Sequence, residues 1–250
     1  MSGTEMNGQP ASARKAPARR RVLDGSVLKV LAVVTMLLDH TASVLMEDTY
    51  YIVFRFGART VDLYELMRLA GRISFPLYAF LLVEGFLHTR NVKRYAGGLL
   101  ILALLSEIPW NLVHSGSWLH ISSQNVLFTL LFGLLGLWVI RDCQGDLWKK
   151  ALLLFGLLAL SVVFHADYGV NGFGFIIMLY LLRDQALCRA LVGCCMLPSL
   201  WKAGVAFSPI SLYNGKRGFI RNRALQYAFY LIYPVHMLVL YWIRLGSIGY

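Results

Sequence analysis

The chain has 250 residues, of which 58% are apolar and 15% charged, and its mean hydropathy is +0.59. Soluble domains carry about 25% charged and about 45–50% apolar residues, so this composition argues against a soluble globular protein. The formal net charge of +11 could suggest nucleic-acid binding, but the Lys and Arg residues lie in short connections between apolar blocks. Because cations in that position are typical of membrane proteins, we expect no nucleic-acid partner.

The apolar blocks are long enough to cross a lipid bilayer. Residues 224–243 are twenty residues without a formal charge, and 125–140 and 151–164 are also uncharged. A helix needs about 20 mostly apolar residues to span the hydrocarbon, and lipid cannot satisfy free backbone amides. The blocks lack the alternation of a membrane barrel. The sequence therefore predicts an all-α, polytopic integral membrane bundle.

Residues 1–24 are rich in Ala, Pro, Gly, Ser and Arg, and are predicted to be a disordered basic tail in the cytosol. Residues 25–250 are predicted to form a single transmembrane domain of about eight helices. These helices cover 27–46, 68–88, 94–114, 125–141, 148–165, 169–182, 186–206 and 224–243.

One connection disagrees with this topology. Lys216, Arg217, Arg221 and Arg223 would lie outside if 186–206 crosses the membrane once. Pro198 and Lys202 interrupt that segment, so a re-entrant or half-length segment, with seven or nine crossings, stays open. The four cysteines (Cys143, Cys188, Cys194, Cys195) have no ligand-like spacing with His, and predict neither a metal site nor a disulfide framework.

Ionisable residues interrupt the apolar blocks. A charged side chain inside the bilayer costs about 2.5–3.5 kcal/mol, so such groups usually face the bundle and pair. With the basic tail inside, several of them fall in the outer half of their helices, and we expect them to meet at one depth. The residues expected at that depth are Asp39, His40, Arg72, Glu107, Asn125 and Asp167, and Glu84 and His236 are further buried polar candidates.

Helical geometry limits how these candidates can pair. Asp39 and His40 are adjacent, so they point about 100° apart and cannot form a simple carboxylate–imidazole pair. An acid that orients His40 would then be Glu107 or Glu84 from another helix, and Arg72 is the natural counter-ion for Asp39 or Glu107. A purely structural latch at Arg72 is the alternative interpretation.

Seven motifs follow one another along the chain: LKVLAVVTMLLDHTA (28–42), RLAGRISFPLYAFLLVEGFLHTRNVKRY (68–95), LLSEIPWNLV (104–113), QNVLFTLLFG (124–133), DYGVNGFG (167–174), YNGKRG (213–218) and QYAFYLIYPVHM (226–237). In this order they resemble the TraX family of integral membrane pilin acetylases. The resemblance covers roughly residues 28–240, and its most specific part is GRISFP…EG…TR followed by SEIPW. More distantly, the chain resembles transmembrane acyltransferases that use a membrane-embedded His.

The resemblance implies a multi-pass enzyme of the bacterial inner membrane that takes acetyl from acetyl-CoA. The implied acceptor is the amino terminus of F-type pilin, a related exported peptide or a surface sugar. His40 would be the base or a transiently acetylated nucleophile, with Glu107 or Asp39 orienting it. Arg72 or Asn125 would stabilise the oxyanion. The CoA phosphates would meet Arg90, Lys93, Arg94 and Arg183, which plain inside-positive loops would also explain.

Two non-enzymatic functions remain open from the sequence. Buried Asp, Glu, Arg and His residues also relay protons in transporters and channels. Transporters often contain internal repeats, and none is evident in this chain. An assembly scaffold would need the buried charges only for folding. The acceptor, the order of transfer and the oligomeric state stay undetermined.

Overall fold

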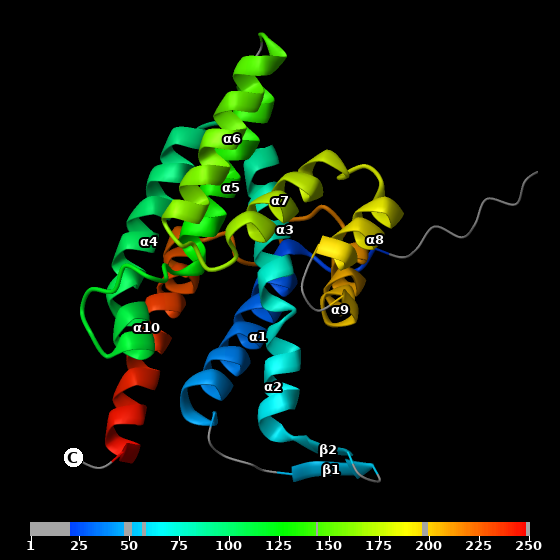
Figure 1. Cartoon of the computed structure of the whole chain (residues 1–250). Helices are drawn as coiled ribbons and strands as arrows, with labels where there is room; N and C mark the ends of the chain where they lie inside the picture. Colours follow the sequence, from blue (N-terminus) through cyan, green and yellow to red (C-terminus); the bar gives the residue numbers. More distant parts are fainter. Residues whose placement is uncertain (1–20, 48–51, 57–58, 144, 197–199, 249–250) are drawn as a thin grey trace, which may run out of the picture.

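The computed structural model describes residues 21–47, 52–56, 59–143, 145–196 and 200–248, so most of the predicted tail lies outside the described residues. Helices dominate (Figure 1), which confirms the all-α membrane bundle; a short antiparallel hairpin was not predicted. The elements are α1 (Gly25–Leu45), β1 (Ile52–Phe56), β2 (Arg59–Asp62), α2 (Leu63–Gly71), α3 (Ser74–His88), α4 (Val92–Ser115), α5 (Val126–Asp142), α6 (Leu147–Val163), α7 (Gly169–Leu181), α8 (Ala186–Met196), α9 (Leu200–Ser211) and α10 (Arg223–Ile248).

Side-chain caps fix where several helices begin. Asp24 accepts hydrogen bonds from the backbone N–H groups that open α1, and Asp62 and Asn125 do the same for α2 and α5. Such caps satisfy N–H groups that have no partner within the helix. Gly116 ends α4 in the left-handed conformation, at a φ of 66°, which glycine adopts without strain. The helix boundaries therefore follow from local sequence.

Within the described part of the chain, four helical segments are long and apolar enough to span a membrane: α1, the α2–α3 pair over 63–88, α4, and α10 over 224–247. The α2–α3 span starts earlier than the predicted 68–88 and breaks at Arg72–Ile73. Helices α5 and α6 have 17 residues each, and α7 has 13. Most of the surface of α6 consists of exposed Leu, Phe and Val side chains, which suit a lipid environment.

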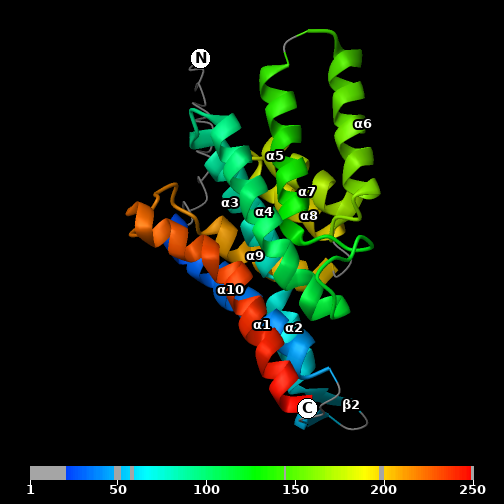
Figure 2. The ribbon, with the colours of Figure 1, turned by 90° about the vertical axis from the view of Figure 1, so that its left-hand side faces the viewer.

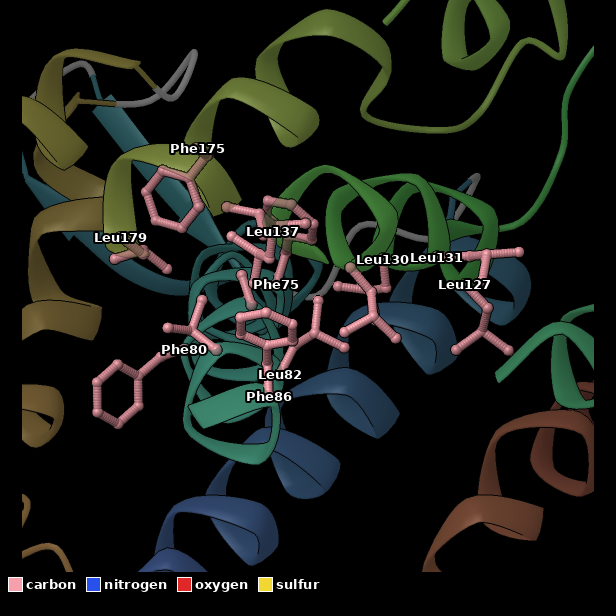
Figure 3. Close-up of a cluster of buried hydrophobic side chains, with 14 of the residues drawn as sticks. Phe75, Phe80, Leu82, Phe86, Leu127, Leu130, Leu131, Leu137, Phe175 and Leu179 are labelled. Carbon is pink, nitrogen blue, oxygen red and sulfur yellow. The ribbon is translucent and has the colours of Figure 1, made fainter. Parts of the chain in front are cut away.

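The apolar core lies where α3, α5 and α7 pack together. Figure 3 shows Phe75, Phe80 and Phe86 of α3 among leucines of α5 and the Phe175 ring of α7. Gly133 and Gly136 let α5 approach α7 closely, because a Cβ at either position would press on side chains of α7. Small residues at helix contacts are the usual means of close packing in lipid.

The prediction of one helix over 186–206 is wrong. This segment forms two short helices, α8 and α9, which pack against each other (Figure 1). The chain then returns to the start of α1, where the Gly25 N–H donates to the Lys216 carbonyl at 2.8 Å and the Leu23 N–H to Leu212 at 3.0 Å. The basic connection 212–222 therefore lies on the same side as the start of α1, which removes the disagreement in the positive-charge pattern.

Two ends of the molecule can be distinguished in Figures 1 and 2. The hairpin end carries β1, β2 and the C-terminal ends of α1 and α10. The basic end carries the α3–α4 and α5–α6 connections, together with Arg90, Lys93, Arg94 and Arg141. This arrangement makes α1, α4 and α10 run toward the hairpin end, while α3 and α5 run toward the basic end.

Candidate functional site

A cavity of about 340 Å³ opens between α1, α2, α4 and the start of α7. Its walls are predominantly polar and come from segments distant in the sequence. They are Asp39, His40 and Ser43 of α1, Arg68 and Arg72 at the end of α2, Trp110 and His114 of α4, and Asp167, Tyr168 and Asn171 around the start of α7. Four of the predicted candidates, Asp39, His40, Arg72 and Asp167, thus share one cavity.

Asp39 has a different partner from the one that we expected. Its Oδ2 lies 2.8 Å from Nη1 of Arg68, whereas among the described residues Arg72 forms no ion pair. The pair is mostly buried, with side chains 21% and 26% exposed. Gly71 makes the approach possible, because a Cβ there would collide with the Asp39 side chain. Oδ1 of Asp39 is buried and, within the described part of the chain, has no hydrogen-bond partner.

His40 contacts a histidine rather than the acid that we expected. Its Nδ1 lies 2.7 Å from Nε2 of His236 in α10, and Nδ1 of His236 lies 2.7 Å from the Ile232 carbonyl oxygen. The Tyr233 ring packs edge-on against both imidazoles, at centroid distances of 5.9 and 5.7 Å. His236 was predicted as a buried polar candidate of undecided role, and the structure places it beside the candidate base.

Glu107 and Asn125 form a hydrogen-bonded pair outside the cavity. Asn125 Nδ2 donates to Oε2 of Glu107 at 2.5 Å and to the Ala103 carbonyl at 3.0 Å. Asn125 is fully buried, and its Oδ1 also caps α5. Neither residue lines the cavity. The predicted role of Glu107 next to His40 is therefore not what the geometry shows, and the pair joins α4 to α5.

The two remaining acidic candidates, Glu84 and Asp167, lie in different parts of the molecule. Glu84 lies on α3 toward the basic end, beside Tyr213, and does not reach the cavity. Asp167, in the connection between α6 and α7, lines the cavity. Although part of its surface is open, the protein packed around it and the nearby Asp39 carboxylate raise the pKa of Asp167 to about 6. Asp167 therefore changes charge near neutral pH.

The four predicted phosphate-binding cations lie at the basic end, away from the cavity. Arg90, Lys93, Arg94 and Arg183 are all exposed. Arg183 also donates to the Tyr180 carbonyl and pairs with Asp184. Helix α3 separates this end from the cavity, and its 15 residues rise about 22 Å.

Six cavity residues were not among the predicted candidates: Arg68, Trp110, His114, Ser43, Tyr168 and Asn171. The spacing of Arg68 and Arg72, four apart on one helix face, was the available signal for the first. His114 shares a helix face with Glu107, but its proximity to a membrane surface favoured an interfacial role. It stacks on Trp110, with ring centroids 3.8 Å apart. No sequence signal indicated that this stack would line the cavity.

Comparisons with known proteins agree over nearly the whole chain. The family model described as "TraX protein" matches residues 24–244. A protein of Dichelobacter nodosus, named "Probable fimbrial assembly protein FimC, serogroup H1", is 31% identical over 243 residues, which cover 85% of this chain and 92% of that protein. No solved structure matches the chain.

Proposed function

The chain belongs to the TraX family, and we propose that it is a membrane acetyltransferase that moves acetyl from acetyl-CoA to an amine of an exported peptide. The observation that carries this proposal is the His40–His236 pair beside a cavity that also holds two carboxylates and two guanidinium groups. Acyl transfer to an amine needs a proton acceptor and groups that stabilise an oxyanion. This cavity has candidates for both tasks.

The proposed reaction uses His40 as the base. The bound ammonium group first loses one proton to solvent, which frees the lone pair of its nitrogen. This nitrogen then forms a bond to the thioester carbonyl carbon while His40 takes a second proton from it. The C–S bond then breaks, and the CoA thiolate leaves and receives that proton, which returns His40 to its neutral form. Arg72 is the group for the oxyanion, because it lines the cavity without an ion-pair partner among the described residues.

The carboxylates favour an amine as the acceptor. An amine arrives as an ammonium group, and Oδ1 of Asp39 is an acceptor that the described residues leave unsatisfied. Asp167 adds a second carboxylate. The name of the D. nodosus relative points to fimbrial assembly, so we take a pilin-like peptide as the acceptor class.

The donor would bind from the basic end. Arg90, Lys93, Arg94 and Arg183 provide the charge that phosphates need, and their exposure leaves them accessible. The thioester would have to pass about 22 Å along α3 to reach His40. We therefore propose that acetyl-CoA binds in an extended conformation along the helix bundle.

We place the protein in the inner membrane, with the tail and the basic end in the cytosol. Cysteines at Lys216 and Val53 test this orientation in a variant that lacks the four native cysteines. A membrane-impermeant maleimide applied to intact cells stripped of their outer membrane should label Val53→Cys, and Lys216→Cys only after lysis. The reverse pattern would overturn the orientation.

The activity test uses the purified full chain in lipid nanodiscs with saturating [¹⁴C]acetyl-CoA. A synthetic peptide with a free α-amine, the same peptide N-acetylated, and a hexosamine serve as acceptors. We expect label on the free-amine peptide, and a loss of about 10²–10⁴-fold in His40→Gln. His88→Gln is the matched control, because His88 lies in the last turn of α3 and bonds only to the Glu84 carbonyl among the described residues.

Other outcomes would redirect the proposal. Label on the hexosamine alone would replace the peptide with a sugar acceptor. No label on any acceptor, together with proton uptake by vesicles that His40→Gln abolishes, would support the rival function of a proton-coupled transporter. Full activity of His40→Gln would remove His40 from the site.

A further inference from the structure

We propose that His236 positions His40, holding its neutral ring as the Nδ1–H tautomer so that the lone pair of Nε2 faces the cavity. This inference rests on the proposed function and specifies how its base is prepared. It starts from the Ile232 carbonyl, which can only accept a hydrogen bond. Nδ1 of His236, 2.7 Å from that oxygen, must therefore carry a proton.

The protonation of the next nitrogen, Nδ1 of His40, follows if the His236 ring is neutral. A neutral His236 that is protonated at Nδ1 has a bare Nε2, so the 2.7 Å contact requires a proton on Nδ1 of His40. A charged His236 would reverse this assignment. Among the described residues, however, no carboxylate lies within ion-pair distance of either ring, and an unpaired cation inside the membrane is costly.

The geometry of the rings fits a directed N–H···N bond. The two imidazoles are parallel to within 1°, with centroids 5.0 Å apart. The two nitrogens are 2.7 Å apart, which is less than the centroid separation by about one ring width. Each nitrogen therefore lies on the line that joins the two centroids. The bond therefore runs close to the planes of both rings, as a strong hydrogen bond requires.

Nε2 of His40 lies on the side of the ring away from His236, and His40 lines the cavity. The same lone pair would serve whether His40 accepts a proton or is acetylated transiently. The groups around it are Arg68 and Arg72 from α2, His114 from α4, Asp167 from the α6–α7 connection, and Tyr233 from α10. When Nε2 takes a proton, the Nδ1 proton can shift to His236, which spreads the charge over two rings without an acid.

The test combines ¹⁵N NMR with kinetics on the full chain in nanodiscs. In ¹⁵N-histidine-labelled protein at neutral pH, the His40 signals, assigned by their loss in His40→Gln, should show a protonated Nδ1 and a bare Nε2. His236→Leu should abolish this single tautomer and lower kcat by about 10²-fold with little change in KM. His236→Gln offers an acceptor oxygen and an amide donor, and should restore the tautomer and much of kcat.

The outcomes separate this inference from the proposed function. A protonated Nε2 on His40 in the native protein, or an unchanged tautomer in His236→Leu, would overturn the positioning role even if acetyl transfer occurs. The expected tautomers without any acetyl transfer would support the positioning role and reject the acetyltransferase. Met237→Leu, one residue along α10 and buried, is the control for packing changes in that helix.

Discussion

The cavity and the apolar core meet where the Phe75 ring of α3 stacks on Tyr168, and different interactions stabilise the two regions. Around the cavity, three polar groups each depend on one partner: Arg68 for Asp39, His236 for His40 and Asn125 for Glu107. In the core, many Phe, Leu and Ile side chains share the packing (Figure 3). Lipid is as apolar as leucine, so close fit stabilises the core, whereas pairing prevents a large penalty at the cavity.

The largest stability effect should come from leaving one cavity charge alone. Arg68→Met leaves the Asp39 carboxylate without its cation, and we expect the free energy of unfolding to fall by about 2–3 kcal/mol. This is less than the roughly 3–5 kcal/mol expected for a fully buried pair, because both side chains are partly exposed. Asp39→Asn combined with Arg68→Met should recover at least half of this loss. Unfolding in mixed micelles measures both variants, and a double variant as unstable as the sum of the singles would contradict the pairing.

A substitution in the core should lower the free energy of unfolding slightly less, because many neighbouring side chains contribute to the packing there. Leu134 of α5 is fully buried, and Leu134→Ala is expected to lose about 2 kcal/mol, the lower end for buried leucines, because lipid removes part of the transfer term. Leu147→Ala is the matched control on α6, where Leu147 is exposed. The same unfolding assay should show almost no change for that control, and equal losses would mean that the core is not packed as described.

A smaller effect on stability is expected at Gly71, where the absence of a side chain gives Asp39 its space. Gly71→Ala places a Cβ against Asp39, so the Asp39–Arg68 pair must shift, at a cost of about 1–2 kcal/mol. Gly98→Ala on α4 meets no atom within 4 Å and should be neutral or slightly stabilising. Thermal unfolding of the two variants side by side checks this, and equal midpoints would refute the close approach.

The smallest effect concerns pH. The raised pKa of Asp167 means that its carboxylate is neutral below about pH 6 and charged above it. If this charge attracts the acceptor ammonium, the KM for the peptide should rise several-fold as the pH falls from 7 to 5. In Asp167→Asn this part of the dependence should disappear. An unchanged pH profile of KM in that variant would exclude Asp167 from acceptor binding.

Sequence patterns predicted the core better than the cavity. Uninterrupted apolar blocks indicated the helices around Leu134 without any knowledge of their partners, because every face of such a helix can be buried in protein or lipid. The errors came at short, interrupted segments such as 186–206, where the length no longer decides between crossing and turning back. The hairpin at 52–62 was missed although Ile52–Phe56 is rich in β-branched and aromatic residues, a composition that favours strands.

For the cavity, the sequence indicated which residues need partners but not which partners they have. Asp39 and His40 were identified by the cost of placing them in lipid. Their neighbours depend on how α1 lies against α2 and α10, and a shift of α2 along its axis by about one turn would exchange Arg68 for Arg72. His236 was identifiable only as a polar residue inside the last apolar block.

The order in which the chain is made has a consequence for the candidate base. His40 and His236 are separated by 196 positions. The Ser26 hydroxyl near the start of α1 donates to the Arg217 carbonyl, which is 191 positions later in the chain. During synthesis α1 therefore enters the membrane with both contacts unmade. Insertion of α10 completes them, so a nascent or prematurely terminated chain would hold a His40 imidazole without its partner, and the proposed activity would begin only after synthesis ends.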